Sequence, residues 1–534
     1  MTEPRSKPRW FPTWKGALLI ALPWFALTWV RWTDPLGDRG SVNVFSYLLI
    51  ILSVVFYLLW FLIASGRPWT TRLGVTVLPV LGVVVFLNVF RIERMSGEMI
   101  PTFALRSTPK SDRVLSAPSR ENGPLVDLKT ATPDDFPGFL GPDGRQAIDH
   151  VRLDPDWSAR PPEELWRREL GSGWSGFAVR NGIAVTMEQR GEQEMVTCYS
   201  VADGEPCWVW AYPTRYESTI AGDGPRATPA IADGVVYSLG VHGKLAALDG
   251  ADGTPIWQRD LDDELGLTEE RSTVLPYGRS NSPLVVGERL IVPYGGTPER
   301  GFVSLLAVDR HSGETLWQGG DHQISCASPV VAVLAGERQI VSVDAERVAG
   351  YDLSTGAVLW SRPWPGRTEA DCNVSQPVPV DGSRVFLSKG YGQGAALVEV
   401  SRNGGAFEVA ELWHQPRTLR TKFTNVSLHE GYVYGLSDGI LECAELETGA
   451  RQWKKGRYRH GQILRVSDHL LVLSEQGEVF LVDADPKNAD SVRGSFQGLD
   501  GKTWNNPALY GDVLLIRNGH EAAAYRLPLA PSTP

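Results

Sequence analysis

The chain has 534 residues, is rich in Gly (55), Pro (37) and Trp (19), and carries a formal net charge of −10. This acidic balance argues against a nucleic-acid partner, because nucleic-acid-binding proteins present basic patches to the phosphates. Five cysteines without a CxxC pair argue against a zinc site and against a dense disulfide framework. We therefore predict neither a nucleic-acid partner nor a metal site.

Three uncharged apolar runs before residue 91 predict a membrane anchor over residues 1–94. A spanning helix needs roughly 17–25 apolar residues, and the second and third runs qualify directly. The first run is shorter, but basic residues at its ends can snorkel and tryptophans flank it. A cleaved signal peptide is the alternative for this run, although no small-x-small site follows it. The predicted helices lie near residues 14–32, 44–64 and 73–90.

Basic residues around these helices predict their orientation. Four precede the first helix and two lie in the second loop: Arg5, Lys7, Arg9, Lys15, Arg67 and Arg72. The two arginines of the first loop are offset by Asp34 and Asp38. The positive-inside rule then places the N-terminus in the cytoplasm, so three crossings carry the rest outward. We predict a bacterial inner-membrane protein with a periplasmic bulk and three helices in the lipid bilayer.

Residues 95–162 carry many prolines and few apolar runs, which predicts an extended, Pro-rich linker. The linker contains a turn-rich stretch, residues 136–145. We expect Phe136, Phe139 and Leu140 in this stretch to pin part of the linker to the following domain.

From Trp166 onward the chain repeats a unit, A-x-D-x-x-x-G-x-x-x-W, which is clearest at residues 247–257, 307–317 and 350–360. The Asp starts a turn by bonding its own backbone, and the Gly closes the turn in the left-handed region. The Trp can bury on the order of 200 Å² against a neighbouring blade. The tryptophans assigned to this structural role are Trp166, Trp208, Trp257, Trp317, Trp360, Trp413 and Trp453.

A polar residue followed by Pro precedes the units and predicts the start of an innermost strand. The steps are Thr228-Pro229, Ser282-Pro283, Ser328-Pro329, Gln376-Pro377 and Asn506-Pro507. Counting the units gives seven blades between residues 176 and 497. The end of the domain supplies strands of an eighth blade, and residues 163–170 complete it, so that the two ends of the domain pair with each other. We predict an all-β, eight-bladed β-propeller over residues 163–527, preceded by three transmembrane helices and followed by a tail, 528–534.

The repeat unit resembles that of the PQQ-like (pyrrolo-quinoline quinone) propeller family over roughly residues 134–527. This family includes quinoprotein dehydrogenases, the outer-membrane protein assembly factor, and envelope proteins without assigned chemistry. Stretches such as residues 134–144 and 225–240 look most similar to the third group. The resemblance implies the eight-bladed propeller and leaves two functions open, a binding module and an enzyme.

The enzyme would be a membrane-bound dehydrogenase of sugars or alcohols that depends on PQQ and calcium. Family members hold the quinone on a Trp floor beside Ca²⁺ and use an Asp or His base. Membrane-bound glucose dehydrogenases also place several spans before the propeller. This chain, however, has short loops, no adjacent cysteine pair and no CxxCH motif. We therefore predict a non-catalytic protein without a cofactor, and keep the dehydrogenase as the alternative.

The binding module would use the mouth of the central channel, where residues just before the innermost strands should project. Amides, arginines and a Trp there can hold a sugar, a peptide strand or a quinone-like ring, or else simply satisfy buried strand ends. We predict a periplasmic scaffold with an envelope protein or peptide partner, in envelope protein assembly. The predicted site residues are Arg226, Asn281, Asn373, Asn425, Trp504 and Asn505, joined by Glu188, Gln189 and Arg190.

The cysteines have mainly structural interpretations. Cys198 and Cys443 occupy the small-residue position of the repeat, where a buried thiol acts as a small apolar group. Cys207 lies across the same predicted hairpin from Cys198, so a bridge between them stays open. Cys326 and Cys372 begin innermost strands in consecutive blades and can approach each other near the channel mouth.

Overall fold

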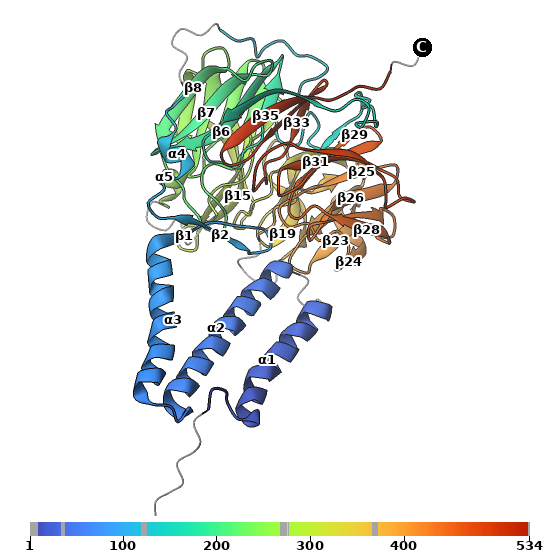
Figure 1. Cartoon of the computed structure of the whole chain (residues 1–534). Helices are drawn as coiled ribbons and strands as arrows, with labels where there is room; N and C mark the ends of the chain where they lie inside the picture. Colours follow the sequence, from blue (N-terminus) through green and yellow to red (C-terminus); the bar gives the residue numbers. More distant parts are fainter. Residues whose placement is uncertain are drawn as a thin grey trace, which may run out of the picture. The chain divides into compact units, whose positions relative to one another are not determined.

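The computed structural model describes residues 9–33, 38–118, 125–267, 275, 277–365 and 372–531. The chain divides into two compact units, residues 1–109 and 110–534, which are described separately below. Figure 1 colours the chain from blue at the N-terminus to red at the C-terminus. Arg5, Lys7 and Asp34, which enter the predicted orientation, lie outside the described residues.

The first unit contains three helices and a hairpin: α1 (Trp14–Thr33), α2 (Arg39–Ala64), α3 (Trp69–Val89), β1 (Phe90–Met95) and β2 (Pro101–Leu105). Helix α2 begins five residues before its predicted start because the Asp38 carboxylate caps it. This carboxylate accepts hydrogen bonds from the backbone N–H groups of Gly40 and Ser41. The hairpin β1–β2 occupies the beginning of the segment that was predicted to be a linker.

The three-span prediction is supported for two of the helices. Among the described residues, α2 and α3 are long and apolar enough to cross a membrane. Helix α1 does not meet this criterion, because its uncharged run between Lys15 and Arg31 is short. The structure therefore shows two candidate spans, and a third crossing stays a prediction.

Among the described residues, the second unit consists of eight blades, and in each blade four antiparallel strands follow one another from the innermost outward. These four strands are consecutive along the chain in blades 1 to 7, whereas blade 8 takes its outermost strand from the beginning of the domain. Blades 1 to 4 are formed by β5 (Ala178–Arg180), β6 (Ile183–Arg190), β7 (Gln193–Ser200) and β8 (Pro206–Pro213); β9 (Ala230–Ala232), β10 (Val235–Leu239), β11 (Lys244–Asp249) and β12 (Pro255–Asp260); β13 (Leu284–Val286), β14 (Arg289–Thr297), β15 (Gly301–Asp309) and β16 (Thr315–Gly319); and β17 (Val330–Leu334), β18 (Glu337–Val343), β19 (Arg347–Asp352) and β20 (Val358–Pro363).

Blades 5 to 8 complete the ring, and blade 7 carries an additional short strand, β3 (Ala147–Ile148). They are formed by β21 (Val378–Pro379), β22 (Arg384–Lys389), β23 (Gly394–Asn403) and β24 (Ala406–Gln415); β25 (Val426–His429), β26 (Tyr432–Ser437), β27 (Ile440–Glu445) and β28 (Arg451–Arg457); β29 (Gln462–Val466), β30 (His469–Leu473), β31 (Glu478–Asp483) and β32 (Val492–Gln497); and β33 (Ala508–Tyr510), β34 (Val513–Arg517), β35 (Glu521–Arg526) and β4 (Glu163–Glu169).

Blade 8 closes the ring with strands from both ends of the domain. Its outermost strand is β4, which pairs antiparallel with β35 and places Trp166 opposite Ala524. The eight-bladed propeller and this closure confirm the prediction made from the repeat. Pairing the two ends leaves no free sheet edge between the first and last blades.

The repeat tryptophans join each blade to the next. The Trp208 indole N–H donates to the Gly250 carbonyl in the turn of blade 2, at 2.9 Å. The turn glycine beside it, Gly253, has φ +78°, and a Cβ there would collide with the Trp208 ring. Glycine is therefore needed for both its backbone conformation and its lack of a side chain. Equivalent indole donors, each bonded to the next blade, are Trp166, Trp257, Trp317, Trp413 and Trp453.

Trp360 is the exception among these tryptophans. Its indole N–H donates to the Gln339 side chain of its own blade, at 2.5 Å. The following blade has a long hairpin between β23 and β24, which turns at Gly404 and Gly405 instead of at the repeat's Asp and Gly. Blade 5 therefore lacks the repeat turn whose carbonyl accepts the indole N–H in the other blades, and Gln339 accepts it instead.

Residues 125–160 form a strap across one end of the propeller. Phe136 exchanges two backbone hydrogen bonds with Val179, at 2.9 and 2.7 Å, and β3 pairs parallel with β29. Phe136 and Leu140 are buried and Phe139 is half-buried. The segment was predicted to be an extended tether with a few pinned side chains. The strap is held along much of its length instead, because its backbone groups find partners on innermost strands.

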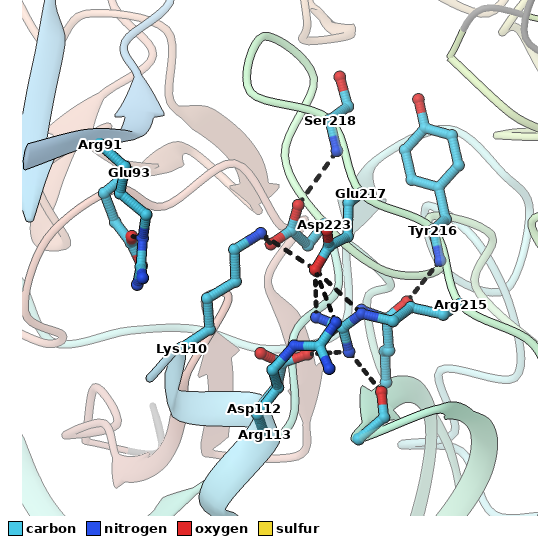
Figure 2. A network of polar contacts seen from close by, with 12 residues as sticks. Arg91, Glu93, Lys110, Asp112, Arg113, Arg215, Tyr216, Glu217, Ser218 and Asp223 are labelled. Carbon is cyan, nitrogen blue, oxygen red and sulfur yellow. Dashed lines mark hydrogen bonds and ion pairs between the residues drawn. The ribbon is translucent and has the colours of Figure 1, made fainter. Parts of the chain in front are cut away.

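A second covering segment, which begins at Lys110, includes α4 (Ser111–Val114) and lies on the opposite end of blade 1 (Figure 2). The fully buried Asp112 carboxylate accepts from Arg215 at 2.8 Å and from Gln189 at 3.2 Å. Lys110 pairs with Asp223 at 2.6 Å. This segment is therefore held mainly by charged side chains, whereas the strap is held mainly by backbone pairing.

Candidate functional site

The two ends of the central channel differ in what covers them. Each innermost strand runs from a loop at one end to a tight turn at the other, and the strap lies at the turn end. Five innermost strands begin just after the predicted polar-Pro steps: β9, β13, β17, β21 and β33. We call the loop end, where the chain approaches these strands, the mouth.

The polar-Pro steps link neighbouring blades into a belt below the mouth. The Thr228 backbone N–H donates to Ser282 Oγ at 2.9 Å, and the Ser282 N–H donates to Ser328 Oγ at 2.8 Å. The Gly176 N–H donates in the same way to Thr228 Oγ1. A polar side chain is needed at Thr228, Ser282 and Ser328 because each of these hydroxyls accepts a buried backbone N–H of the preceding blade.

An aromatic cluster of Trp174, Phe423 and Trp504 lies in the mouth. The Trp504 ring stacks on Phe423 with centroids 4.6 Å apart and lies 5.3 Å from the Trp174 ring. All three side chains are half-buried, so each ring keeps part of its surface exposed. The Lys502 ammonium lies 3.3 Å from the centroid of Trp504 and 4.8 Å from that of Trp174.

Neighbouring polar groups fix these rings in place. The Gln462 amide donates to the carbonyl oxygens of both Phe423 and Trp504, at 2.8 and 2.7 Å. The Trp504 indole N–H donates to the Glu475 carboxylate at 2.9 Å. The loops that carry Phe423 and Trp504 are thus tied to blade 7, which reduces the cost of ordering these loops when a ligand binds.

Further cations accompany aromatic rings around the mouth. The Lys422 ammonium lies 5.2 Å from the Tyr391 ring and 5.5 Å from Phe423. The Arg226 guanidinium lies 4.5 Å from the Tyr216 ring and donates to carbonyls of residues 222 and 224. Cations over ring faces are stabilised by the ring quadrupole. The mouth therefore offers aromatic surface together with positive charge, which suits an anionic group.

The predicted site residues fall into three sets. Arg226 and Trp504 belong to the mouth. Asn281, Asn373 and Asn505 are nearly fully buried, and their amides donate to backbone carbonyls, as in the bonds from Asn505 to Gly173 and Ser175. Asn425 accepts from the Gln376 N–H. These four amides satisfy buried strand ends.

Glu188, Gln189 and Arg190 form a buried group beneath α4. The Glu188 carboxylate is fully buried and accepts from Tyr199 at 2.6 Å and from Arg190 at 3.0 Å. Burial raises its pKa, but Arg190 and Arg517 outweigh burial and hold the pKa of Glu188 below its ordinary value. Gln189 donates to Asp112, so this trio supports the covering segment and is not part of the aromatic cluster.

The sequence analysis missed Trp174, Phe423, Lys422 and Lys502. The available signal is a spacing: Trp174, Phe423 and Trp504 each stand two residues before a step residue, Gly176, Asn425 or Asn506. In an extended segment, alternate side chains point to opposite sides. Residues two before the step therefore face the mouth, whereas Asn281 and Asn505, one before it, face the neighbouring blade.

The strap end holds two hollows. One is a cavity of about 560 Å³ between residues 137–145 of the strap and the innermost strands of blades 2 to 5. The other, of about 460 Å³, is lined by charged side chains that include Asp149, Arg465 and Asp468. Arg465 pairs with Asp149 at 2.7 Å, so the charges of the second hollow are partly neutralised within the fold.

A family model described as the outer membrane protein assembly factor BamB matches residues 157–297 and 192–455, together more than half of the chain. BamB of Yersinia pestis is 24% identical over 302 residues, which cover 54% of this chain and 67% of that protein. The quinoprotein alcohol dehydrogenase PedH of Pseudomonas putida KT2440 is 24% identical over 201 residues, 35% of this chain and 30% of the dehydrogenase.

Among solved structures, the quinohemoprotein alcohol dehydrogenase from Comamonas testosteroni aligns with a TM-score of 0.54 at 11% identity, over 75% of this chain and 82% of that one. At this identity the likeness shows the propeller fold alone. The repeat, the eight closed blades and the family match agree with one another, and the chain belongs to the PQQ-like propeller family of the outer membrane protein assembly factor BamB.

Proposed function

We propose that this protein is a membrane-anchored, non-catalytic scaffold that binds an acidic, aromatic-containing segment of an envelope protein at the mouth of its propeller. The observation that carries the proposal is the aromatic cluster of Trp174, Phe423 and Trp504 with Lys502 and Lys422 beside it. Half-exposed rings offer stacking surface, and the adjacent cations offer partners for carboxylates.

The net charge of the whole chain limits where an acidic ligand can bind. The net charge is −10, so an acidic ligand is repelled by most of the protein surface. At the mouth, Lys422 and Lys502 lie beside the aromatic cluster, and Arg226 lies over the Tyr216 ring. A local basic site on an acidic protein steers an acidic partner to one place and excludes basic ones.

The class of partner and the location rest on the comparisons and on the first unit. BamB is described as an outer membrane protein assembly factor, which supports a protein partner in envelope assembly. The apolar helices α2 and α3 support attachment to a membrane. The periplasmic side follows from the basic residues around the helices, through the positive-inside rule.

A peptide titration tests the proposal. Full-length protein in nanodiscs is titrated with a Glu-Tyr repeat peptide and, as a charge-reversed control, with a Lys-Tyr repeat peptide, and tryptophan quenching is followed. We expect binding of the acidic peptide alone, weakening with salt. The double variant Lys422→Gln/Lys502→Gln should lose it, whereas Lys487→Gln, at an exposed turn of blade 7, should not. Equal binding of both peptides would contradict the proposal.

The second candidate is the PQQ- and calcium-dependent dehydrogenase. The same rings and cations also suit a planar, carboxylated quinone, and residues matched to PedH cover 35% of the chain. For calcium the fit is poorer: across the described ranges, no group of three or more His, Cys, Asp or Glu side chains is placed so that it could hold a metal ion. The mouth carboxylate Glu475 is held by the Trp504 indole. We derive no catalytic step from this site.

Titration with PQQ and Ca²⁺ separates the two candidates. Tryptophan quenching is followed together with dye reduction in the presence of glucose or ethanol. Stoichiometric quenching with turnover would establish a dehydrogenase and overturn the non-catalytic proposal. We expect no turnover.

A further inference from the structure

We propose that Cys326 and Cys372 are a redox-active pair that forms a reversible disulfide between blades 4 and 5 at the mouth. The inference does not depend on which ligand the mouth binds. It concerns residues outside the aromatic cluster, and it rests on the contacts between the two loops that lead into β17 and β21.

The backbones beside the two cysteines are held together. The Cys326 N–H donates to the Asn373 carbonyl at 2.9 Å, and the Asn373 N–H donates to Ser325 Oγ at 2.8 Å. These reciprocal bonds join the residue beside Cys372 to Cys326 and its neighbour. The two thiols interact, neither forms a disulfide, and both residues are half-buried. Because the backbones beside them are already joined, formation of a disulfide does not require two separate loops to be brought together.

The surroundings of Cys326 favour its thiolate. Contact with the Cys372 thiol, together with Ser280, Arg226 and Lys389, outweighs burial and holds the pKa of the Cys326 thiol below its ordinary value. Arg226, in the loop before blade 2, and Lys389, in blade 5, act on the Cys326 thiol through their positive charge. Because the thiolate is the nucleophile in disulfide exchange, Cys326 is the expected attacking residue.

A second cysteine pair in the same chain provides an internal comparison. Cys198 and Cys207 lie near each other on the β7–β8 hairpin and are both buried. Burial is the main cause that raises the pKa of the Cys198 thiol well above its ordinary value. The two pairs thus share proximity but differ in access and in thiolate character, and we expect only the mouth pair to exchange readily.

The reaction is a thiol–disulfide exchange with a disulfide oxidant. The Cys326 thiolate attacks one sulfur of the oxidant, forms a mixed disulfide and expels one thiolate. Cys372 then loses its proton and attacks the Cys326 sulfur, which forms the intramolecular bond and expels the second thiolate. The cysteine pair loses two electrons and two protons in total, and the oxidant disulfide is reduced to two thiols.

Peptide mapping tests the bond on the full-length protein, with oxidised glutathione as the probe. Trypsin places Cys326 in residues 311–338 and Cys372 in residues 368–384, so only a disulfide can join these peptides. The protein is oxidised in its folded state, alkylated, digested and analysed by mass spectrometry. We expect the joined peptide in the wild type, its loss on reduction, and slow alkylation of Cys198.

Single substitutions provide the controls. Cys326→Ser and Cys372→Ser should each abolish the joined peptide and leave the other cysteine as a mixed disulfide with glutathione. Cys443→Ser removes a buried cysteine elsewhere and should leave the bond intact. Circular dichroism checks that each variant is folded. Absence of the joined peptide in folded wild type, or its appearance only in urea, would overturn the proposal.

Discussion

The two ends of the propeller channel are covered in different ways. At the strap end, Phe136 pairs with Val179 and β3 pairs with β29, so backbone groups and buried apolar side chains close the structure. At the mouth, Trp174, Phe423 and Trp504 stay half-exposed beside cations. Groups at the strap end are engaged within the fold, whereas rings at the mouth keep surface for a partner. The strap end is therefore expected to determine stability, and the mouth to determine binding.

The largest expected effect is on stability, at the strap end. Phe136 is 2% exposed, and its truncation in Phe136→Ala should lower the free energy of unfolding by about 3–5 kcal/mol. Urea unfolding of the full chain, followed by circular dichroism, measures this loss. Phe139→Ala, at a half-buried position of the same stretch, should cost less. If Phe136→Ala weakened binding of the Glu-Tyr peptide and left the free energy of unfolding unchanged, this result would contradict the assignment of stability to the strap end and of binding to the mouth.

A pH effect of intermediate size is expected beneath the mouth. Glu194 is fully buried, and burial raises its pKa to about 7, although Tyr212 and the Val241 N–H donate to it. In the unfolded chain this pKa is near 4.3. The folded protein therefore holds an extra proton between these values, and the free energy of unfolding falls as pH rises from about 4.3 to 7.

The variant Glu194→Gln tests this pH effect because Gln still accepts both hydrogen bonds. It should be more stable than the wild type by about 3 to 4 kcal/mol at pH 8, and equally stable below pH 4. Urea midpoints measured across this range give the difference. A difference that is independent of pH would show that Glu194 titrates normally in the folded state.

The aromatic cluster should show a smaller effect, confined to binding. Trp504→Ala removes the central ring, which contacts both Phe423 and Trp174, and should weaken Glu-Tyr peptide binding about tenfold, or about 1.4 kcal/mol. Trp504→Phe keeps a stacking ring and should weaken binding less. Titration by fluorescence gives both values. Equal losses in the two variants would mean that the indole N–H bond to Glu475 matters more than stacking.

The sequence predicts the parts of this fold that depend on residues close to one another along the chain. The Asp, Gly and Trp of each unit act within eleven residues, so the blades and the closure through Trp166 could be counted. The partner of Trp360 could not be predicted, because it depends on the length of the next blade's hairpin. The strap's pairing with β29 joins residues over 300 positions apart without any local pattern.

Among the predicted site residues, Arg226 and Trp504 stand two residues before a step and belong to the mouth. Asn281 and Asn505 stand one residue from the strand step and face the neighbouring blade, whereas Trp504 stands two residues away. A shift of one residue reverses the side to which an extended chain points its side chain. Residue type alone favoured the amides as ligand-binding groups. Only the alternation of side chains along each loop distinguishes the residues that face the mouth from those that face the neighbouring blade.

The smallest effect is expected in the segment that covers blade 1 at its mouth end (Figure 2). Arg113 pairs with Glu192 at 2.6 Å, but the two side chains are 43% and 70% exposed. Arg113→Ala should therefore change the free energy of unfolding by no more than about 0.5 kcal/mol. Arg215 keeps Asp112 and Glu217 as partners in this variant. Urea unfolding at low and high salt measures the change. A loss as large as that of Phe136→Ala would mean that an exposed ion pair holds the mouth end as firmly as a buried apolar side chain holds the strap.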